Sequence, residues 1–429
     1  MKYLLVADSI CTKPAPASES FELMNRSTVT PVDILHRWQA GVSVARPYGG
    51  YANEEDRPLA KALRSEGKPS KTIARDLDRL AFWELASDVR SRAFGITSDN
   101  VAQVVRCKTD LFFSLLDELH TLPLKSTVFL ETLWNLWLPL AMQLSTEKQN
   151  LNRPLIQGIL GGQGTGKTTL CQVLSLILGK LGYSTVSLSL DDLYKTYADR
   201  QQLQKADPRL IWRGPPGTHD IDLGIAVLDK LRLSQTRELA AVDTPKSDAL
   251  KPDIIKNIEI PRFDKSACGG AGDRSQPEII SGADIVLFEG WFVGVNPVVD
   301  AKLNDFLAAA PFPISTEDDC RFARDMNAKL HDYLPLWNRL DRLMVLYPQD
   351  YRISQVWRNQ AEQEMMAAGK SGMSEAEINR FVEYFWKALH PELFIKSMVE
   401  GDGVDLVIEI MSDRTVGKIC RAIDLKLSD

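Results

Sequence analysis

One short segment constrains the fold of this chain more than any other: the glycine-rich run GGQGTGKT at residues 161–168. The apolar run LIQGIL at 155–160 precedes it, and apolar residues at helical spacing from Leu170 to Leu181 follow it. The alternating run TVSLSL at 185–190 comes next and is typical of a β-strand. This order predicts a βαβ unit, in which two parallel strands are joined by a right-handed crossover.

The same segment matches the pattern GxxxxGK[ST] and predicts a phosphate-binding loop. Glycines let successive backbone N–H groups point inward at an anion, and the following helix N-terminus adds partial positive charge. We expect Lys167 to reach the β and γ phosphates of ATP and Thr168 to offer its hydroxyl to Mg²⁺. The residues expected to bind the nucleotide through this loop are Gly161, Gly162, Gln163, Gly164, Thr165, Gly166, Lys167, Thr168 and Thr169.

Further short apolar runs extend the α/β pattern over the rest of the chain. The additional strand candidates are residues 258–261, 285–288, 343–346 and 406–410. Strands alternating with helical segments predict an α/β protein with the P-loop NTPase fold, in which helices flank a mostly parallel sheet.

Residues 1–150 carry no chemical motif and are predicted to be mostly helical, because apolar residues recur there at steps of three and four. The apolar stretch 127–144 approaches the length of a membrane span, but polar residues interrupt it and Pro139 would kink it. We therefore expect a buried helix there. This N-terminal region is interpreted as a cap or scaffold for a second domain at 151–429.

Charge and cysteine content narrow the functional class. The 429 residues include 51 Lys and Arg and 57 Asp and Glu, a formal net charge of −6, which argues against nucleic-acid or anionic-membrane partners. The six cysteines are far apart and form no CxxC pair, so neither a zinc site nor a disulfide framework is indicated. The apolar run at 3–7 is too short for a secretory signal. We expect a cytoplasmic monomer that acts on a small molecule.

Two carboxylates follow predicted strands and are candidates for chemistry at the carboxyl edge of the sheet. Asp191 could accept a proton from a substrate hydroxyl, whereas the alternative is a turn or helix cap, which we favour for Asp192. Glu289 follows the run 285–288 in the manner of a Walker B acid, the alternative being a surface acid. The predicted ligands of Mg²⁺ are Thr168, Asp191 and Glu289.

Seven motifs in order give the chain a family resemblance over about residues 150 to 415. They are GGQGTGKTT (161–169), SLDDLY (189–194), RGPPGTHD (213–220), IPRFDKS (260–266), GDR (272–274), FEGWFVG (288–294) and VEYFWKALHPELF (382–394). With them the sequence resembles the plant and cyanobacterial type of D-glycerate 3-kinase, a branch of the P-loop phosphoribulokinase, uridine kinase and pantothenate kinase group.

The resemblance implies roles for individual residues. Asp191 would be the general base and Glu289 the Walker B acid, with Lys167 as the third catalytic residue. Substrate recognition would fall to His219, Asp220, Arg262, Asp264 and Lys265, and Tyr194 could line the acceptor pocket, the alternative for this tyrosine being core packing. The carboxylate of glycerate requires a cation, and Arg262, Lys265, Arg274 or His219 could supply it. For each of these four, a surface charge or loop ion pair is the alternative.

Phosphoryl transfer also requires that water be kept from the γ-phosphate, which predicts a mobile lid. Related kinases place theirs near residues 351–363. There Arg352 and Arg358 could stabilise charge in the transition state, with Arg358 expected to touch the nucleotide, unless both lie on an exposed helix. The segment 411–414 after the last strand is a candidate contact for adenine. We expect Cys268 to be a buried, inert thiol.

The sequence thus predicts an ATP- and Mg²⁺-dependent kinase that transfers the γ-phosphoryl group to the 3-hydroxyl of D-glycerate. The products are 3-phosphoglycerate and ADP, and the family resemblance implies a role in photorespiration. Two alternatives stay open: a P-loop kinase for another small hydroxylated metabolite, and a nucleotide-binding regulatory protein without transfer activity.

Overall fold

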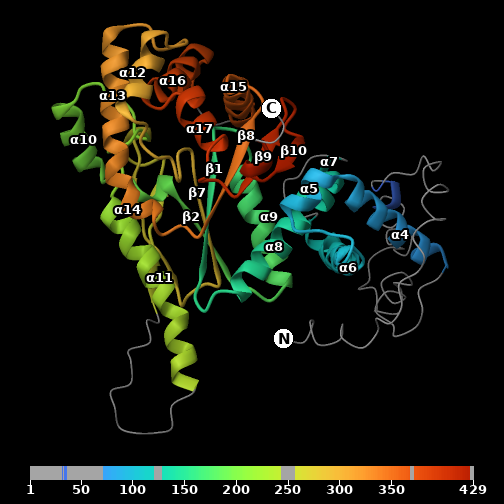
Figure 1. Cartoon of the computed structure of the whole chain (residues 1–429). Helices are drawn as coiled ribbons and strands as arrows, with labels where there is room; N and C mark the ends of the chain where they lie inside the picture. The colour runs from blue at the N-terminus through green and yellow to red at the C-terminus, as the bar shows by residue number, and fades with distance from the viewer. Residues whose placement is uncertain are drawn as a thin grey trace.

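The centre of the molecule is a six-stranded sheet in which β1 lies between β7 and β8 (Figure 1). The computed structural model describes residues 31, 33–35, 71–119, 128–242, 257–367 and 372–425. The strand order is β10, β9, β8, β1, β7, β2, and every pair is parallel except β9 with β10. The strands are β1 (Leu155–Gly161), β2 (Thr185–Ser189), β7 (Ile285–Gly290), β8 (Arg342–Pro348), β9 (Leu406–Ile410) and β10 (Val416–Cys420). The predicted α/β class and mostly parallel sheet are confirmed.

Alternating side chains of the strands build two cores, one on each face of the sheet. On β1, Leu155 and Ile159 join one buried cluster, whereas Ile156 and Leu160 join the other. Figure 1 shows α8 (Leu138–Gln149) and α9 (Lys167–Lys180) on the first face. The second face carries α11 (Ile221–Val242), α13 (Glu317–Leu330) and α14 (Leu334–Trp337). Both faces are covered, which explains why the central strands are almost wholly apolar.

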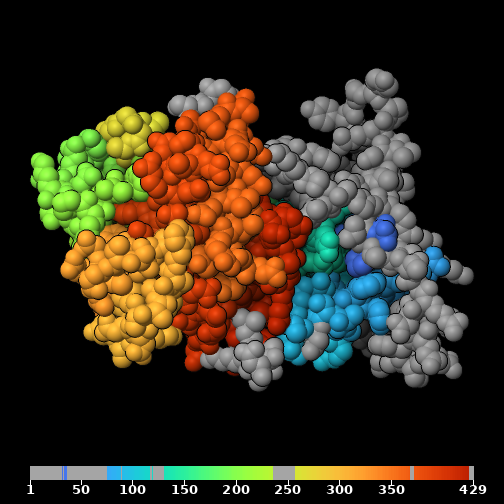
Figure 2. Space-filling view, turned by 90° about the horizontal axis from the view of Figure 1, so that it is seen from above, coloured from blue at the N-terminus to red at the C-terminus, as the bar shows by residue number. Residues whose placement is uncertain are grey.

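The helices before β1 share the first core. They are α4 (Lys71–Ala86), α5 (Asp88–Ala93), α6 (Val101–Leu119), α7 (Val128–Thr132) and a π-helix (Leu133–Trp137) that leads into α8. Figure 2 shows the blue N-terminal helices beside the red C-terminal segment, where α5 packs on the edge strand β10. Phe112 of α6 and Trp134 belong to the same buried cluster as Ile159. The described part of this region is helical, as predicted.

The predicted buried helix at 127–144 is present from Val128 onward, and its irregularity has a local cause. Pro139 lies in the first turn of α8 and has no N–H to donate within the helix. Just before it, the N–H of Leu138 donates to the carbonyl of Leu133, five residues back, which is the π-helical pattern. The helix therefore continues past Pro139 through one wider, π-helical turn instead of ending there.

One predicted strand does not belong to the central sheet. Residues 258–261 form only the short strand β3 (Ile258–Ile260), which pairs antiparallel with β6 (Glu278–Ile280) in a separate two-stranded sheet. A second small sheet joins β4 (Phe263–Asp264) and β5 (Asp273–Arg274). The expectation of a further central strand was wrong because Glu259 is exposed between two buried isoleucines, a pattern that suits a surface hairpin.

The remaining helices surround the carboxyl edge of the sheet and its second face. They are η4 (Leu190–Leu193), α10 (Tyr197–Ala206), η5 (Cys268–Gly270), α12 (Asp300–Ala308), η6 (His331–Tyr333), α15 (Ile353–Ala367), α16 (Glu375–Ala388), α17 (Pro391–Val399) and α18 (Ala422–Leu425). Within the described ranges, no helix has both the length and the apolar character needed to cross a membrane.

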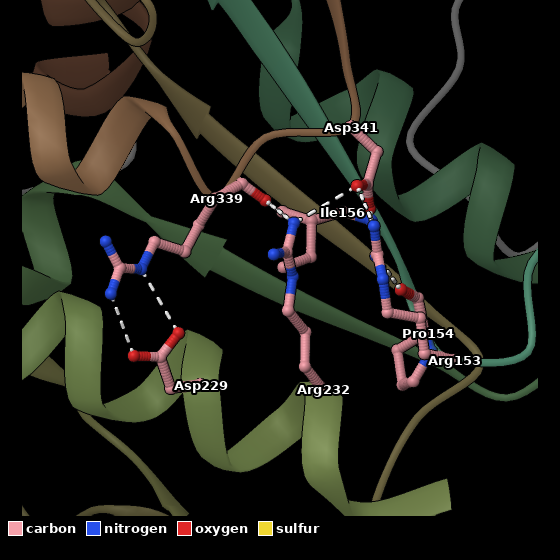
Figure 3. Close-up of polar contacts among 7 residues, drawn as sticks. All are labelled: Arg153, Pro154, Ile156, Asp229, Arg232, Arg339 and Asp341. Atoms are coloured by element: carbon pink, nitrogen blue, oxygen red, sulfur yellow. Dashed lines mark hydrogen bonds and ion pairs between the residues drawn. The ribbon is translucent and has the colours of Figure 1, made fainter. Parts of the chain in front are cut away.

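At the opposite, amino edge of the sheet, one carboxylate joins three elements (Figure 3). Asp341, just before β8, accepts two hydrogen bonds from Arg153 at 2.8 and 2.7 Å and one from the N–H of Ile156 at 2.8 Å. Arg232 of α11 approaches the same carboxylate at 3.1 Å. The start of β1, the start of β8 and α11 are thereby held together on the side of the sheet away from the glycine-rich loop.

Candidate functional site

The loop between β1 and α9 has the backbone shape that its glycines predict. Gly164 and Gly166 have φ of 79° and 87°, and Gly166 is the residue that caps α9. The buried Thr165 donates its hydroxyl proton to the carbonyl of Gly162 at 2.9 Å. The Lys167 ammonium donates to the same carbonyl at 3.0 Å. The loop is therefore folded back on itself around the lysine, as an anion-binding nest requires.

Two acidic side chains face the charge of Lys167 from neighbouring strands. Glu289 lies within β7, because this strand continues two residues beyond its predicted end. On the neighbouring strand β2, the residue paired with Glu289 is Ser189. Burial lowers the pKa of Lys167, and the charges of Glu289 and Asp191 partly offset that effect. Burial raises the pKa of Glu289, against the opposing charge of Lys167. The three residues predicted as catalytic therefore interact electrostatically at one edge of the sheet.

Asp191 stands in η4, directly after β2, and both of its carboxylate oxygens accept hydrogen bonds. The Tyr194 hydroxyl donates to Oδ1 at 2.7 Å, and the Lys265 ammonium donates to Oδ2 at 2.7 Å. Burial alone would raise the pKa of the Asp191 carboxyl, but Lys265 and Tyr194 outweigh burial and lower it below its ordinary value. The carboxylate is thus held ionised, as a proton acceptor requires.

Asp192 has the structural role that the sequence favours for it. Its carboxylate accepts from the N–H of Ser189 at 3.0 Å, and the Ser189 hydroxyl accepts from the N–H of Asp191, which together form a capping box. Arg262 donates to Asp192 at 3.0 Å and to Glu278 at 2.5 Å. The guanidinium of Arg262 is therefore occupied by two carboxylates rather than open toward a ligand.

Arg274 and Asp220 form a second ion pair beside Tyr194. Arg274 donates to Asp220 at 2.6 Å and to the carbonyl of Tyr194 at 3.0 Å. The other oxygen of Asp220 accepts from the N–H of Leu223 in the first turn of α11. Burial raises the pKa of Asp220, but the hydrogen bonds from Arg274 and Leu223 lower it overall.

Two residues of the loop around β4 lie at the surface. Asp264 is exposed and accepts from the N–H and hydroxyl of Ser266 at 2.8 and 2.6 Å, so its carboxylate closes a local turn. Cys268 is exposed at a φ of 51°, and the expected buried thiol is wrong. The reason is its position in the short turn Cys268–Gly270, where two glycines offer no side chains to cover the sulfur.

His219 is buried beneath Tyr194 and does not supply a cation. Its ring stacks on Tyr194 with centroids 4.7 Å apart, and only 1% of the residue is exposed. The Tyr333 hydroxyl accepts from the N–H of Gly217 at 2.9 Å and is hydrogen-bonded to His219 Nδ1 at 2.7 Å, whereas His219 Nε2 is buried without a hydrogen-bond partner among the described residues. Burial lowers the pKa of His219 to about 3. The expectation that His219 could neutralise a substrate carboxylate is therefore wrong.

The expected lid segment begins the helix α15, which packs on the phosphate loop. The Trp357 side chain lies so close to Gly164 that a Cβ at that glycine would be 2.6 Å from Trp357 Cβ. The indole N–H of Trp357 donates to the carbonyl of Ser412 at 3.0 Å, in the 411–414 segment proposed to touch adenine. Arg358 pairs with Glu362 at 2.9 Å, and Arg352 pairs with Asp350 at 2.9 Å.

A cavity of about 80 Å³ lies beside the phosphate loop. Gly162 and Gln163 line one side of it, and the end of β8 together with α15, α16 and α17 lines the other. Gln163 Oε1 is buried without a hydrogen-bond partner. Sequence reasoning identified the loop itself and the motifs that contain Trp291, Phe385 and Trp386, but gave no role to Trp357 or Tyr333, because aromatic residues in helices carry no pattern that distinguishes a site from a core.

The arrangement fits a nucleoside triphosphate and Mg²⁺. The nest and Lys167 suit phosphates, and Thr168 is exposed in the first turn of α9. No group of three or more His, Cys, Asp or Glu side chains in the described ranges is arranged to hold a metal by itself. Mg²⁺ in phosphoryl-transfer sites is held by one or two carboxylates, substrate phosphates and water, so Thr168, Asp191 and Glu289 form a compatible donor set.

The chain is similar to characterised and uncharacterised kinases. No family model matches it. It is 32% identical over 241 residues to the uncharacterized kinase mug58 of Schizosaccharomyces pombe, which covers 54% of this chain and 79% of that protein. It is 30% identical over 271 residues to the chloroplastic D-glycerate 3-kinase of Arabidopsis thaliana, which covers 61% of this chain. That match spans 53% of the plant protein, so this chain matches about half of its length.

A solved structure supports the fold. The chain superposes on the D-glycerate 3-kinase of Cryptococcus neoformans var. grubii serotype A with a TM-score of 0.57 and 24% sequence identity. The match covers 69% of this chain and 99% of the fungal one. The resemblance therefore extends well beyond the phosphate loop and over more than half of the chain.

Proposed function

Because this chain belongs to the family of P-loop kinases that contains these relatives, we propose that it transfers the γ-phosphoryl group of ATP to the 3-hydroxyl of D-glycerate. The observation that carries this proposal is the convergence of an ionised carboxylate, Asp191, with the phosphate loop and Lys167 at one edge of the sheet. A regulatory nucleotide-binding protein has no need for an ionised carboxylate beside its phosphate loop.

In the proposed reaction the loop N–H groups and Lys167 hold the phosphates, and Asp191 accepts the proton of the acceptor hydroxyl. As that proton leaves, the hydroxyl oxygen forms a bond to the γ-phosphorus, and the bond from the γ-phosphorus to ADP breaks. Mg²⁺, held by Thr168, Asp191 and Glu289, would supply charge neutralisation at the β and γ phosphates.

Glycerate is supported as the acceptor by its chemistry as well as by the plant relative. The acceptor needs a hydroxyl for phosphorylation and presents a carboxylate that requires a cation. Lys265 is within hydrogen-bond distance of Asp191, and 63% of its side chain is exposed. Of the basic residues expected at the acceptor, it is therefore the best placed to meet a small acid, since Arg262 and Arg274 are already paired.

The test is ADP release from MgATP with a panel of acceptors: D-glycerate, L-glycerate, glycerol, uridine and pantothenate. We expect rapid release only with D-glycerate, and identification of the product as 3-phosphoglycerate rather than 2-phosphoglycerate. Release stimulated by a different acceptor would replace the substrate but keep the kinase. ATP binding with no stimulation by any acceptor would favour the regulatory alternative.

The finer expectations rest on the sequence and stay predictions: use of Mg²⁺ in particular, a cytoplasmic location, a monomeric state and a role in photorespiration. The contacts of Arg358 and of residues 411–414 with the nucleotide also stay predictions. So does the division into an N-terminal region at 1–150 and a kinase domain at 151–429 with a lid near 351–363. Omission of Mg²⁺ from the assay tests the first of these directly.

A further inference from the structure

The expected base has one donor on each of its two oxygens. Asp191 Oδ1 accepts from the Tyr194 hydroxyl, and Asp191 Oδ2 accepts from the Lys265 ammonium, each at 2.7 Å. Each oxygen keeps a further lone pair, but the positive charge of the ammonium stabilises the ionised carboxylate and so makes Oδ2 a weaker acceptor for the proton of a hydroxyl. Asp191 therefore becomes a stronger base when the contact with Lys265 opens.

Lys265 is the partner that can leave. Tyr194 is buried to 3% exposure and stacks on His219, so its hydroxyl is fixed. The Lys265 side chain is 63% exposed, stands in the turn after β4, and has a flexible four-carbon stem. Exposed ion pairs of this kind contribute little to stability, so opening one costs little.

The neighbouring cations differ from Lys265 in this respect. Arg262 is held between Asp192 and Glu278, and Arg274 between Asp220 and the carbonyl of Tyr194. Each would have to give up two contacts to meet an acceptor. Lys265 has to give up one, and that contact is with the base itself.

We propose that Lys265 exchanges one carboxylate partner for another: it leaves Asp191 for the carboxylate of the acceptor, and so frees Oδ2 of Asp191 only when the acceptor is an anion. This inference rests on the proposed function. The ammonium keeps its proton and has one carboxylate partner before and after the exchange. The proton that reaches Oδ2 comes from the acceptor hydroxyl, while Tyr194 keeps the carboxylate oriented through Oδ1.

The exchange makes Lys265 a specificity-determining residue. A neutral polyol such as glycerol carries the same hydroxyls as glycerate but offers no charge to draw Lys265 away, so Asp191 stays engaged. Water meets the same barrier, which limits hydrolysis of ATP without an acceptor. One ion pair thereby links recognition of the acid to activation of the base.

The test compares Lys265→Met with wild type, using kcat/KM for D-glycerate and for glycerol. We expect Lys265→Met to lose at least 100-fold with glycerate and to keep or increase its activity with glycerol. ADP release without an acceptor should rise at least threefold, because Asp191 no longer holds the ammonium. Lys265→Arg should recover much of the glycerate activity. Lys205→Met, which removes an exposed lysine at the end of α10, is the matched control and should behave as wild type.

The outcomes separate this inference from the proposed function. If wild type prefers another acid to glycerate, the substrate assignment fails, and the exchange is judged by repeating the comparison with that acid and its neutral analogue. An equal fall with the anionic and the neutral acceptor in Lys265→Met would overturn the exchange. So would an unchanged or lower rate of ADP release without an acceptor, which can be measured whatever the acceptor is.

Discussion

At Asp191, burial opposes the charge of Lys265 and the hydrogen bonds from Lys265 and Tyr194, and the charge and hydrogen bonds prevail. Burial raises the pKa, while Lys265 and Tyr194 lower it. Glu289 shows the reverse balance, because burial raises its pKa against the charge of Lys167. Two acids at the same edge of the sheet are thus given different proton affinities by their neighbours, which suits different roles in one reaction.

Asp191→Asn tests the role of the base. The amide can still accept from Tyr194, but it cannot take up a proton, so we expect kcat to fall by about 10²–10⁴-fold. Affinity for ATP measured without Mg²⁺ should change little, because the loop and Lys167 are untouched, whereas the affinity for MgATP also reports the loss of one proposed Mg²⁺ ligand. Steady-state kinetics and ATP titration measure both quantities. Retention of wild-type kcat would mean that another group accepts the proton.

His219 gives the molecule a stability that depends on pH. Its pKa falls from 6.5 to about 3 on folding, through burial first, and the charges of Asp191 and Lys195 act on it in opposite directions. Below pH 6.5 the unfolded chain binds a proton that the folded chain excludes, so stability falls as the pH decreases. At pH 5 the loss relative to pH 7.5 is about 2 kcal/mol.

The matched variant is His219→Gln, which keeps a hydrogen-bond partner for the Tyr333 hydroxyl but does not titrate in this range. Chemical unfolding at pH 7.5 and pH 5 should show a smaller loss of free energy of unfolding in the variant than in wild type, by about 2 kcal/mol. Equal losses in the two proteins would show that His219 binds its proton in the folded state.

Among individual residues, the sequence predicts those whose role follows from a local sequence pattern. Lys167 and Thr168 follow from the loop motif, and Asp191 from its place after a strand. The pairing of Lys265 with Asp191 could not be predicted, because it joins residues 74 positions apart through the turn after β4. The burial of His219 depends on Tyr333, which is 114 positions away and carries no motif of its own.

Among the elements, helix α15 packs closely on the phosphate loop. Gly164 has a φ of 79° and lies against the Trp357 side chain. The close packing of α15 on the loop therefore requires a residue without a side chain at position 164. The indole N–H also holds the 411–414 segment through Ser412. α15 therefore joins the phosphate loop to the segment after β9.

Gly164→Ala should damage this junction. The left-handed backbone costs alanine about 1–2 kcal/mol, and the new methyl group collides with Trp357 in addition. We expect a lower melting temperature and weaker ATP binding. Gly179→Ala is the control, because that glycine lies in α9 with open space around it and should gain about 0.5–1 kcal/mol. Equal effects of the two substitutions would contradict the role given to Gly164.

The elements were predictable where their periodicity was long. The strands β1, β2, β7, β8 and β9 and helix α9 follow from apolar runs and helical spacing. β3 was misplaced because three residues cannot reveal whether their partner is the central sheet or a hairpin. The edge strand β10, with only its last two residues buried, carries too weak a pattern to be found.

Across the whole molecule, the candidate site and the polar contacts of Asp341 lie at opposite edges of the sheet. The phosphate loop, Asp191 and Glu289 follow the carboxyl ends of parallel strands, as ligand sites in open α/β sheets do. Asp341 connects β1, β8 and α11 at the amino edge (Figure 3). The N-terminal helices share one core with the first face, so the sheet is braced from that side as well.

This separation predicts that stability and catalysis can be changed independently at Asp341. Its side chain is 12% exposed and accepts from Arg153, Arg232 and the N–H of Ile156, so Asp341→Ala leaves three donors without their acceptor. We expect the free energy of unfolding to fall by about 2–3 kcal/mol, because Asp341 is partly buried and its hydrogen bonds to two charged donors and one backbone N–H are lost. KM for ATP and for the acceptor should stay as in wild type at a temperature where the variant is folded.

Asp229→Ala is the matched control, and Asp229 lies in the same region of the molecule (Figure 3). Asp229 pairs with Arg339 through two hydrogen bonds at 3.1 and 3.0 Å, but its side chain is 45% exposed. Solvent screens this pair, so its loss should cost no more than about 1 kcal/mol. Thermal and chemical unfolding of the two variants measure the difference. If both lose the same stability, the amino edge is not held by Asp341; if Asp341→Ala raises KM, the two edges of the sheet are coupled.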